Sequence, residues 1–199
     1  MMKEVLLSVN PEWLFLEKTG VKKLELRKTA PKLKAPFKVK LYCTHGKLLY
    51  ANYPDGPNSK RIQLADYTTK AKYKGFGNQL NGKVIGEFIC DDIDRVAVYN
   101  DMLYSEKNSQ ANKLHQLCMS VDLVKKYLGD KNRGFIWHIS NLNIYDKPKE
   151  LSEFYTRCNV PESKCKLCNN CFDREDSHGR HYAVKQLTRP PQSWCYVEG

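Results

Sequence analysis

The chain has 199 residues, of which 41% are hydrophobic and 11% aromatic, enough to bury one sizeable core. No apolar run approaches the roughly 20 residues that a membrane-spanning helix needs. The first residues hold no long apolar stretch with a small-residue cleavage site, so we expect no signal peptide and a cytoplasmic protein.

The net charge of +11 is concentrated in one part of the chain. Residues 1–75 carry 16 Lys and Arg residues against 6 Asp and Glu residues, whereas the remainder carries 17 against 16. A one-sided basic field attracts polyanions, and the asymmetry favours a nucleic-acid partner. The simpler alternative is a charged surface that only keeps the protein dissolved.

The first half of the chain is predicted to contain one short helix among strands. Asn10 can cap this helix, Pro11 fits its first position and Gly20 can close it, which predicts a helix over residues 10–20. Strands are expected at residues 3–9, 21–28, 37–46 and 47–53, with the last two paired as a hairpin.

Residues 54–82 are predicted to form a loop insertion, because they have weak periodicity and several turn formers. Aromatic and basic side chains interleave there, as stacking on single-stranded nucleic acid requires. The alternative is a solvated loop whose rings pack back on the domain. The residues concerned are Tyr67, Tyr73, Phe76, Arg61, Lys70, Lys72 and Lys74.

The second half adds the strongest strand signal, at residues 83–99, and a helical region at 109–130. Ser120 is expected to start the second segment of that region and Gly129 to end it. Further strands are expected at residues 133–146 and 193–198, with a turn and one helical turn at 147–155. Together these elements predict a single α+β domain over residues 1–199, built on a curved sheet or small barrel.

Four of the eight cysteines lie within fourteen residues, with the spacing Cys-x6-Cys-x2-Cys-x2-Cys. Four thiolates at such spacing complete a tetrahedral zinc site, which predicts a structural Zn²⁺ and a small zinc-binding knuckle over residues 156–181. His178 or His181 could replace one cysteine. Iron–sulfur binding, a redox dithiol and unligated thiols are the alternatives. The predicted ligands are Cys158, Cys165, Cys168 and Cys171.

Residues 20–27 read GVKKLELR and fit the pattern Gly-x-Lys-x-x-Glu-x-Arg. This stretch resembles the signature of the ASCH domain, a branch of the PUA-like fold, and the segment GKVIGEFICDDI follows it at about the right distance for that family. The segments WHISNLNIYDKPKELSEF and RPPQSWCYV resemble a bacterial and phage subfamily. The resemblance implies a β-barrel-type sheet flanked by helices, with a cleft beside the motif. It also implies a ligand that is RNA or a modified nucleotide.

Some small bacterial relatives in that family resemble amidohydrolases that act on acylated cytidine, and ribonuclease activity is associated with other members. The amidohydrolase branch has a lysine, a threonine three residues later and a glutamate on a following strand. Lys22 matches the lysine and Glu87 the second acid, but position 25 is Glu. That departure weakens the deacylase hypothesis, because a carboxylate cannot play the part of a hydroxyl.

Lys22 and Glu87 are therefore the candidate catalytic residues, and Lys22, Lys23, Glu25, Arg27 and Lys28 the candidate ligand-binding residues. Strict strand alternation would place Lys22 opposite Glu25, so convergence requires Lys22 to lie in the turn before the strand. The simpler alternative is a surface ion pair between Glu25 and Arg27.

Three functions remain open from the sequence. The first is recognition of RNA or a nucleotide by a basic cleft around the motif. The second is hydrolysis of an acylated nucleoside or of single-stranded RNA. The third is a phage or mobile-element protein whose partner is another protein. Trp13 could stack a base in the cleft, although core packing is the simpler role for it.

Overall fold

A computed structural model describes residues 3–45, 51–52, 61–62, 80–107, 110–158, 171–175, 179 and 181–198. Within this part of the chain no helix is both long and apolar enough to cross a membrane. The helices are α1 (Pro11–Lys18), α2 (Gln110–Leu117) and α3 (Val121–Leu128), with short 3₁₀ turns at Gly129–Lys131 and Leu151–Glu153. The strands are β1 (Lys3–Val9), β2 (Leu24–Arg27), β3 (Phe37–Cys43), β4 (Ala51–Asn52), β5 (Arg61–Ile62), β6 (Lys83–Tyr99), β7 (Met102–Ser105), β8 (Arg133–Glu150), β9 (Tyr155–Arg157), β10 (Cys171–Glu175), β11 (His181–Gln186) and β12 (Trp194–Glu198).

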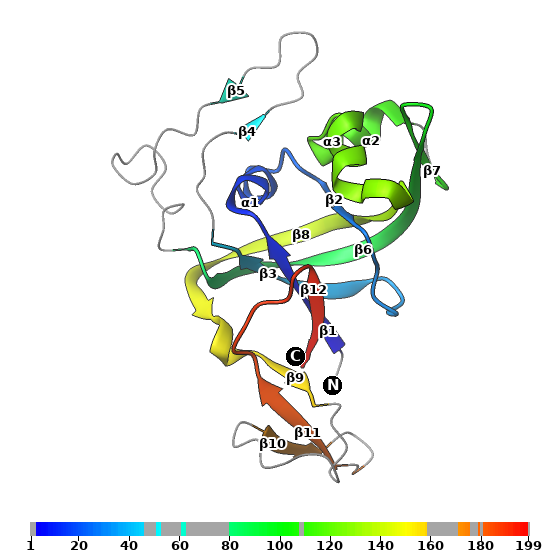
Figure 1. The fold of residues 1–199 in the computed structure, drawn as a ribbon. Helices are drawn as coiled ribbons and strands as arrows, with labels where there is room; N and C mark the ends of the chain where they lie inside the picture. The colour runs from blue at the N-terminus through cyan, green and yellow to red at the C-terminus, as the bar shows by residue number, and fades with distance from the viewer. Residues whose placement is uncertain are drawn as a thin grey trace.

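The main sheet has seven strands in the order β12-β1-β3-β6-β8-β2, with β7 paired to β6. Strands β1 and β3 run parallel, and the other neighbours run antiparallel. The long strands β6 and β8 pair along most of their length, with three register shifts that let the sheet bend. The predicted α+β class is therefore confirmed (Figure 1).

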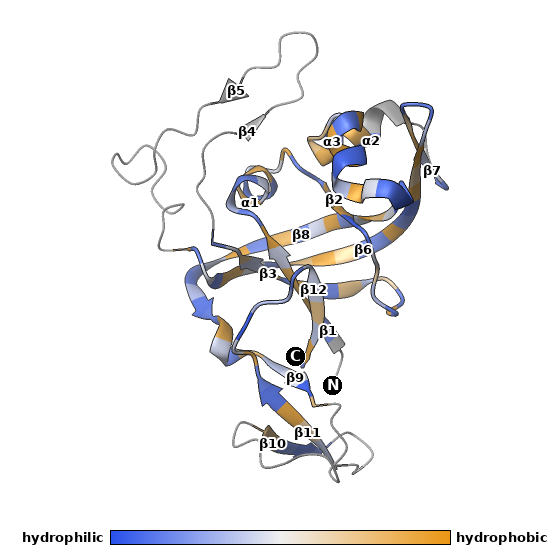
Figure 2. Cartoon of the chain, viewed as in Figure 1, coloured by the Kyte–Doolittle hydropathy of each residue, from blue (hydrophilic) through white to orange (hydrophobic). Residues whose placement is uncertain are grey.

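The core lies between the sheet and the helices that cover it. Helix α1 contributes Leu14, Phe15 and Leu16 to a buried cluster with alternate residues of β1 and β3. Helices α2 and α3 cover the other end, where they pack on β2, β6 and β8. Figure 2 shows the apolar segments of β6 and β8 in orange, and both apolar and polar stretches on α3.

Most predicted elements form where the local sequence signals place them. Ser120 caps α3 by accepting a hydrogen bond from the backbone of Leu123, and Gly129 ends it with a positive φ of 69°. Helix α1 starts at Pro11 as expected, but the side chain of Asn10 does not cap it. The Asn10 side chain instead accepts a hydrogen bond from Thr44 Oγ1 at 2.8 Å.

The predicted barrel does not close among the described strands. Strands β12 and β2 are the two ends of the main sheet, and they share no backbone ladder. Side chains bridge the gap instead: Trp194 Nε1 donates to Thr29 Oγ1 at 3.0 Å, and Arg27 Nη2 donates to the carbonyl of Ser8 at 2.8 Å. The result is an open, curved sheet whose ends meet through polar and aromatic contacts.

The segment predicted as a zinc-binding knuckle contains strands that the sequence did not indicate. Strands β10, β11 and β9 form a separate three-stranded sheet in that order. Cys158 follows β9, with its backbone N–H bonded to Ala183 of β11, and Cys171 begins β10 opposite Lys185 of β11. Cys165, Cys168 and His178 lie outside the described residues, and only the backbone of His181 is described.

The predicted hairpin of residues 37–46 and 47–53 is wrong in its described part, because β4 pairs with β5 and not with β3. Apart from the short strand β5 and residues 80–82, the predicted loop insertion at 54–82 lies outside the described residues, as do its aromatic rings.

Candidate functional site

A cleft of about 420 Å³ opens where the two ends of the main sheet face each other. It is bounded by the end of β1, the start of α1, strand β2, helix α3 and the segment before β12. The side chains that matter most for its chemistry are Trp13, Lys22, Glu25, Arg27, Lys126 and Tyr127.

The motif residues reach this cleft because β2 is shorter than the sequence predicts. Strand β2 begins only at Leu24, so Lys22 lies in the preceding turn and is free of strand alternation. Leu24 and Leu26 point into the core beneath α2 and α3, which directs Glu25 and Arg27 to the other side. Lys22, Glu25 and Arg27 therefore meet at the cleft, as expected if Lys22 lay in the turn before the strand.

Glu25 is held between two cations. Its Oε2 lies 2.5 Å from Lys22 Nζ, and its Oε1 lies 2.6 Å from Arg27 Nη2. Lys22 also donates to the carbonyl of Leu24, and Arg27 donates to the carbonyl of Ser8. All three charged side chains are buried, at 2%, 5% and 7% exposure for Lys22, Glu25 and Arg27. The sequence left open a surface ion pair between Glu25 and Arg27. The structure instead shows a buried network that also includes Lys22.

A second carboxyl, that of Glu17 on α1, lies beside this network. Burial and the neighbouring Glu25 carboxylate raise the pKa of Glu17 well above its ordinary value. Burial alone would also raise the pKa of Glu25, but Lys22 and Arg27 beside it lower that pKa. The two carboxyls therefore have pKa values that shift in opposite directions, upward for Glu17 and downward for Glu25. Nothing local in the sequence marks a helical glutamate as buried, so Glu17 carries no signal there.

The cleft carries an excess of positive charge, because three lining cations face the single ionised carboxylate Glu25. Lys22 and Arg27 are already paired, whereas Lys126 is exposed at the cleft wall on α3. Two aromatic rings, those of Trp13 and Tyr127, line the same space. Lys22 Nζ lies 6.0 Å from the centre of the Trp13 ring. Such a cleft suits an anionic ligand with a planar group.

The two other candidate cations, Lys23 and Lys28, lie next to the cleft. The backbone of Lys23 ties β2 to its neighbours, by donating to the carbonyl of Gln116 and accepting from the N–H of Ile139. Lys28 Nζ lies 5.6 Å from the ring centre of Tyr127, on the far side of the strand end. Neither side chain lines the cleft itself.

Glu87 does not join Lys22. It lies on β6 and pairs with Lys40 at 2.5 Å and Lys38 at 3.8 Å, and Tyr145 donates to it at 2.8 Å. These two lysines alternate along β3 with Val39 and Leu41, which belong to the core beneath α1. Glu87 therefore lies on the face of the sheet opposite α1. The expectation that it shares a site with Lys22 is not met by this geometry.

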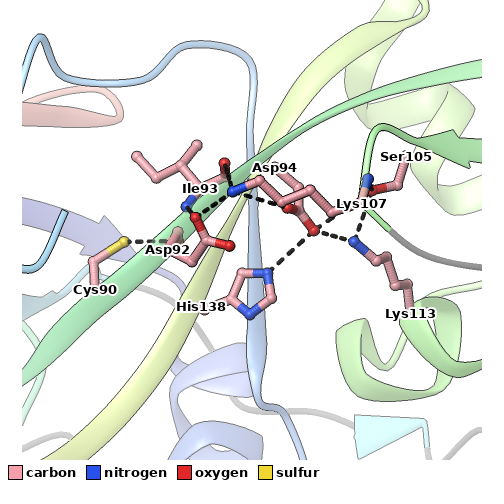
Figure 3. A network of polar contacts seen from close by, with 8 residues as sticks. All are labelled: Cys90, Asp92, Ile93, Asp94, Ser105, Lys107, Lys113 and His138. Carbon is pink, nitrogen blue, oxygen red and sulfur yellow. Dashed lines mark hydrogen bonds and ion pairs between the residues drawn. The ribbon is translucent and has the colours of Figure 1, made fainter. Parts of the chain in front are cut away.

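A polar cluster surrounds buried Asp94, and the sequence alone did not predict it (Figure 3). Asp94 pairs with Lys113 and with His138, whose Nε2 lies 3.2 Å from Asp94 Oδ2, and Asp92 pairs with Lys107 at 2.5 Å. Asp92, Asp94 and His138 have ligand atoms close enough together for one metal ion. Because two lysines already neutralise the two carboxylates, we interpret the cluster as a salt-bridge network.

The fold is similar to that of solved ASCH structures. The crystal structure of ASCH from Zymomonas mobilis matches with a TM-score of 0.50 at 14% sequence identity, over 98% of this chain and 87% of that chain. A point mutant of the protein from the same organism matches with a TM-score of 0.50 at 13% identity, over 98% and 88%. At these identities the likeness is one of fold. No protein-family model and no curated protein matches the sequence.

Proposed function

We propose that this chain, whose fold is similar to that of the Zymomonas mobilis ASCH protein, is an ASCH-type domain that binds RNA or a nucleotide in the cleft beside β2. The observation that supports this most strongly is the convergence of Lys22, Glu25 and Arg27 on one cleft lined by two aromatic rings. These are the residues on which the resemblance to the family depends. The proposed ligand and the bacterial or phage subfamily come from that resemblance.

The buried network shapes the cleft and leaves few free groups. Lys22 and Arg27 Nη2 bond to Glu25 and to backbone carbonyls, so we assign these two residues to fixing β2 against β1 and to providing a positive field. Arg27 Nε is buried without a hydrogen-bond partner among the described residues. Lys126 is the exposed lining cation that can pair with a ligand phosphate. Trp13 and Tyr127 can stack a base. A volume of about 420 Å³ suits a ligand the size of a nucleotide.

Fluorescence anisotropy with a labelled single-stranded RNA of twelve nucleotides tests this function. We expect salt-dependent binding that Lys126→Gln weakens about fivefold, in line with the loss of one phosphate contact. The matched control is Lys125→Gln, which removes the same charge from the same helix. Lys125 pairs with Asp101, away from the cleft, so its loss should change the affinity less than twofold. Equal effects of the two variants would contradict the assignment.

The hydrolase alternative rests on Glu87 reaching Lys22, and the contacts of Glu87 place it on the other face of the sheet. Position 25 is also a glutamate bound by two cations, not a free hydroxyl. We therefore place recognition ahead of hydrolysis. Incubation of wild-type protein and Glu87→Gln with acylated cytidine and with single-stranded RNA tests the alternative. Turnover lost in the variant would restore it.

We also propose a structural Zn²⁺ held by Cys158, Cys165, Cys168 and Cys171. The supporting observation is that Cys158 and Cys171, the first and last of the set, lie beside the same strand β11. A closed tetrathiolate site would fasten the small sheet without taking part in chemistry.

A further inference from the structure

A second concavity, larger than the cleft, lies on the main sheet where β6, β7 and β8 meet the end of β2. Its volume is about 960 Å³. Four exposed cations line it, against the single acid Glu106. We call this surface the basic groove, defined by Lys28, Arg95, Lys131 and Arg133 together with the rings of Tyr104 and Phe135.

The groove follows from the strand register. Tyr104 on β7 pairs with Ala97 on β6, and Ala97 pairs with Arg133 on β8. Residues paired across strands share one face of a sheet, so the small side chain of Ala97 leaves a hollow between the aromatic ring and the guanidinium. The neighbouring row is Arg95 on β6 and Phe135 on β8. Cations and rings therefore alternate across the hollow.

Among the described residues, the four cations of the groove have no acid partner within 4.0 Å. The ion pairs in the described part of the chain involve other cations. These include the cations of the cleft, of β3, of the Asp94 cluster and of the small sheet. A surface with four unpaired cations and one acid has a field that attracts an extended anion. The exposed ring of Tyr104, at 43% exposure, adds a stacking surface beside them.

The wall of the groove is fixed from behind by the Asp94 cluster. Lys113 donates to Ser105 Oγ at 2.7 Å and pairs with Asp94, which ties α2 and β7 to β6 (Figure 3). Ser105 lines the groove, and its hydroxyl is bonded to the cluster, since it accepts from Lys113 and donates to Asp94 Oδ2 at 3.5 Å. The cluster therefore holds this wall of the groove in place.

The basic groove and the cleft are neighbours. Arg95, Phe135 and Arg27 occupy one row across β6, β8 and β2, and the row begins in the groove and ends in the cleft. Lys28 of the groove also lies over the ring of Tyr127, which lines the cleft. A single linear ligand can therefore occupy the basic groove and the cleft together, without crossing another helix or strand.

We propose that the basic groove binds the sugar–phosphate backbone of single-stranded RNA, one nucleotide of which occupies the cleft. The inference rests on the proposed function for the identity of the polymer. It adds a second site, with its own residues, and predicts that affinity increases with the length of the RNA. Phosphate contacts give affinity that depends on salt and not on sequence, as expected for a groove of cations and rings.

The test compares two charge-matched double variants by fluorescence anisotropy over a series of KCl concentrations. Arg95→Gln/Arg133→Gln removes two groove cations. Lys147→Gln/Arg189→Gln removes two exposed cations elsewhere, on the far part of β8 and before β12. The probes are a labelled twelve-nucleotide single-stranded RNA and a labelled nucleoside monophosphate. All four substituted side chains are exposed, and the melting temperature of each variant verifies that it folds.

We expect the groove variant to bind the twelve-nucleotide RNA about tenfold more weakly, and the magnitude of its salt slope to fall by about 1.4, at about 0.7 for each lost contact. The monophosphate should bind with unchanged affinity, and the control variant should match wild type within twofold. Equal losses in both double variants, or no loss in the groove variant, would overturn the inference.

The failures of the two proposals are distinguishable. If Lys126→Gln weakens RNA binding but the groove variant does not, the cleft proposal is supported and the groove proposal is overturned. The reverse pattern would support the groove and contradict the cleft. Groove-dependent binding of poly-glutamate that is tighter than that of RNA would overturn the inference in favour of an acidic protein partner. Failure of wild type to bind RNA at all would contradict both.

Discussion

Glu17 and Glu25 are two carboxyls in one buried cluster, and their environments shift their pKa values in opposite directions. Burial opposes the ionisation of both, and the Glu25 carboxylate raises the pKa of Glu17 further. Lys22 and Arg27 bring the pKa of Glu25 below its ordinary value. The two titrations are coupled, because the charge on each carboxyl acts on the other.

The raised pKa of Glu17 makes a prediction for stability. Above the ordinary carboxyl pKa of 4.5 the unfolded chain releases a proton that the folded protein keeps, so stability falls as pH rises from that value toward the folded pKa. Glu17→Gln mimics the protonated acid and should remove this dependence. The melting temperature of the variant should therefore decline less than that of wild type between pH 5 and pH 8.

Calorimetry checks this prediction. In a domain of this size, the melting temperature shifts by about 2–4 °C for each kcal/mol of stability. Glu106→Gln, at an exposed position, is the control and should keep the wild-type pH dependence. Parallel pH profiles for wild type and Glu17→Gln would show that Glu17 is ionised in the folded protein.

The buried pair of Asp94 and Lys113 makes a second prediction. The Asp94 side chain is 1% exposed, and although burial opposes ionisation, the hydrogen bonds from Lys113 and His138 lower its pKa. Lys113→Met should lower the free energy of unfolding by about 3 kcal/mol, because a buried carboxylate loses its ammonium partner. The double variant Asp94→Asn/Lys113→Met should lose less than the sum of the single variants. Urea denaturation measures both, and additive losses would contradict the pairing.

At the scale of elements, strands β1, β2, β3, β6, β8 and β12 were predictable from the local sequence, whereas β5, β7, β9, β10 and β11 were not. Strand β7 was missed although Asn100 and Asp101 mark its turn: both have positive φ, as a two-residue hairpin turn requires. Strand β8 runs to Glu150, beyond the predicted end at residue 146, and includes Pro148. Among the described strands, β2 covers only residues 135–138 of β8, so the distal part of β8 has an edge that tolerates proline.

Close packing of β2 on β8 depends on Gly134. A Cβ at this position would lie 2.8 Å from the carbonyl oxygen of Arg27 and 2.6 Å from Leu128 Cδ2. Gly134→Ala should therefore push β2 away and destabilise the protein by about 1–3 kcal/mol. Hydrogen exchange should speed up at the amides of β2 while those between β1 and β3 stay protected. Unchanged exchange throughout β2 would show that the strand end adapts without cost.

The proposed zinc site makes a prediction at the same scale. Protein purified without chelator should contain about one zinc per chain by mass spectrometry, and Cys168→Ser should lower that content. Removal of the metal should raise hydrogen exchange in β9 and β11 and leave the main sheet protected. A metal-free preparation with wild-type exchange in the small sheet would contradict the proposal.

At the scale of the molecule, the sequence indicated the sheet and the position of the cleft but not how the sheet ends meet. The motif residues were identified from their pattern, whereas Lys126 and Tyr127 come from a helix about a hundred positions away and carry no local signal. The extent of pairing is also invisible in sequence: an ion pair of Glu25 with Arg27 could be considered, but the sequence did not indicate that Lys22 also pairs with Glu25 or that the network is buried.

The charge distribution gives a similar lesson. Nearly all the net charge lies in residues 1–75, yet three of the four cations of the basic groove come from the nearly neutral remainder. Folding brings Arg95, Lys131 and Arg133 onto one surface, while several acids of that part of the chain pair with other cations. Net charge along the sequence therefore does not locate the basic surface.

Chemical-shift mapping by NMR tests the central claim most directly, because it reports which residues meet the ligand. Titration of the ¹⁵N-labelled protein with a nucleoside monophosphate should shift the indole N–H of Trp13, the amides of Leu24–Arg27 and those of Lys126 and Tyr127. The small sheet β9–β11 should not respond. Shifts confined to other elements, with the cleft resonances unmoved at saturation, would contradict the assignment of the cleft as the binding site.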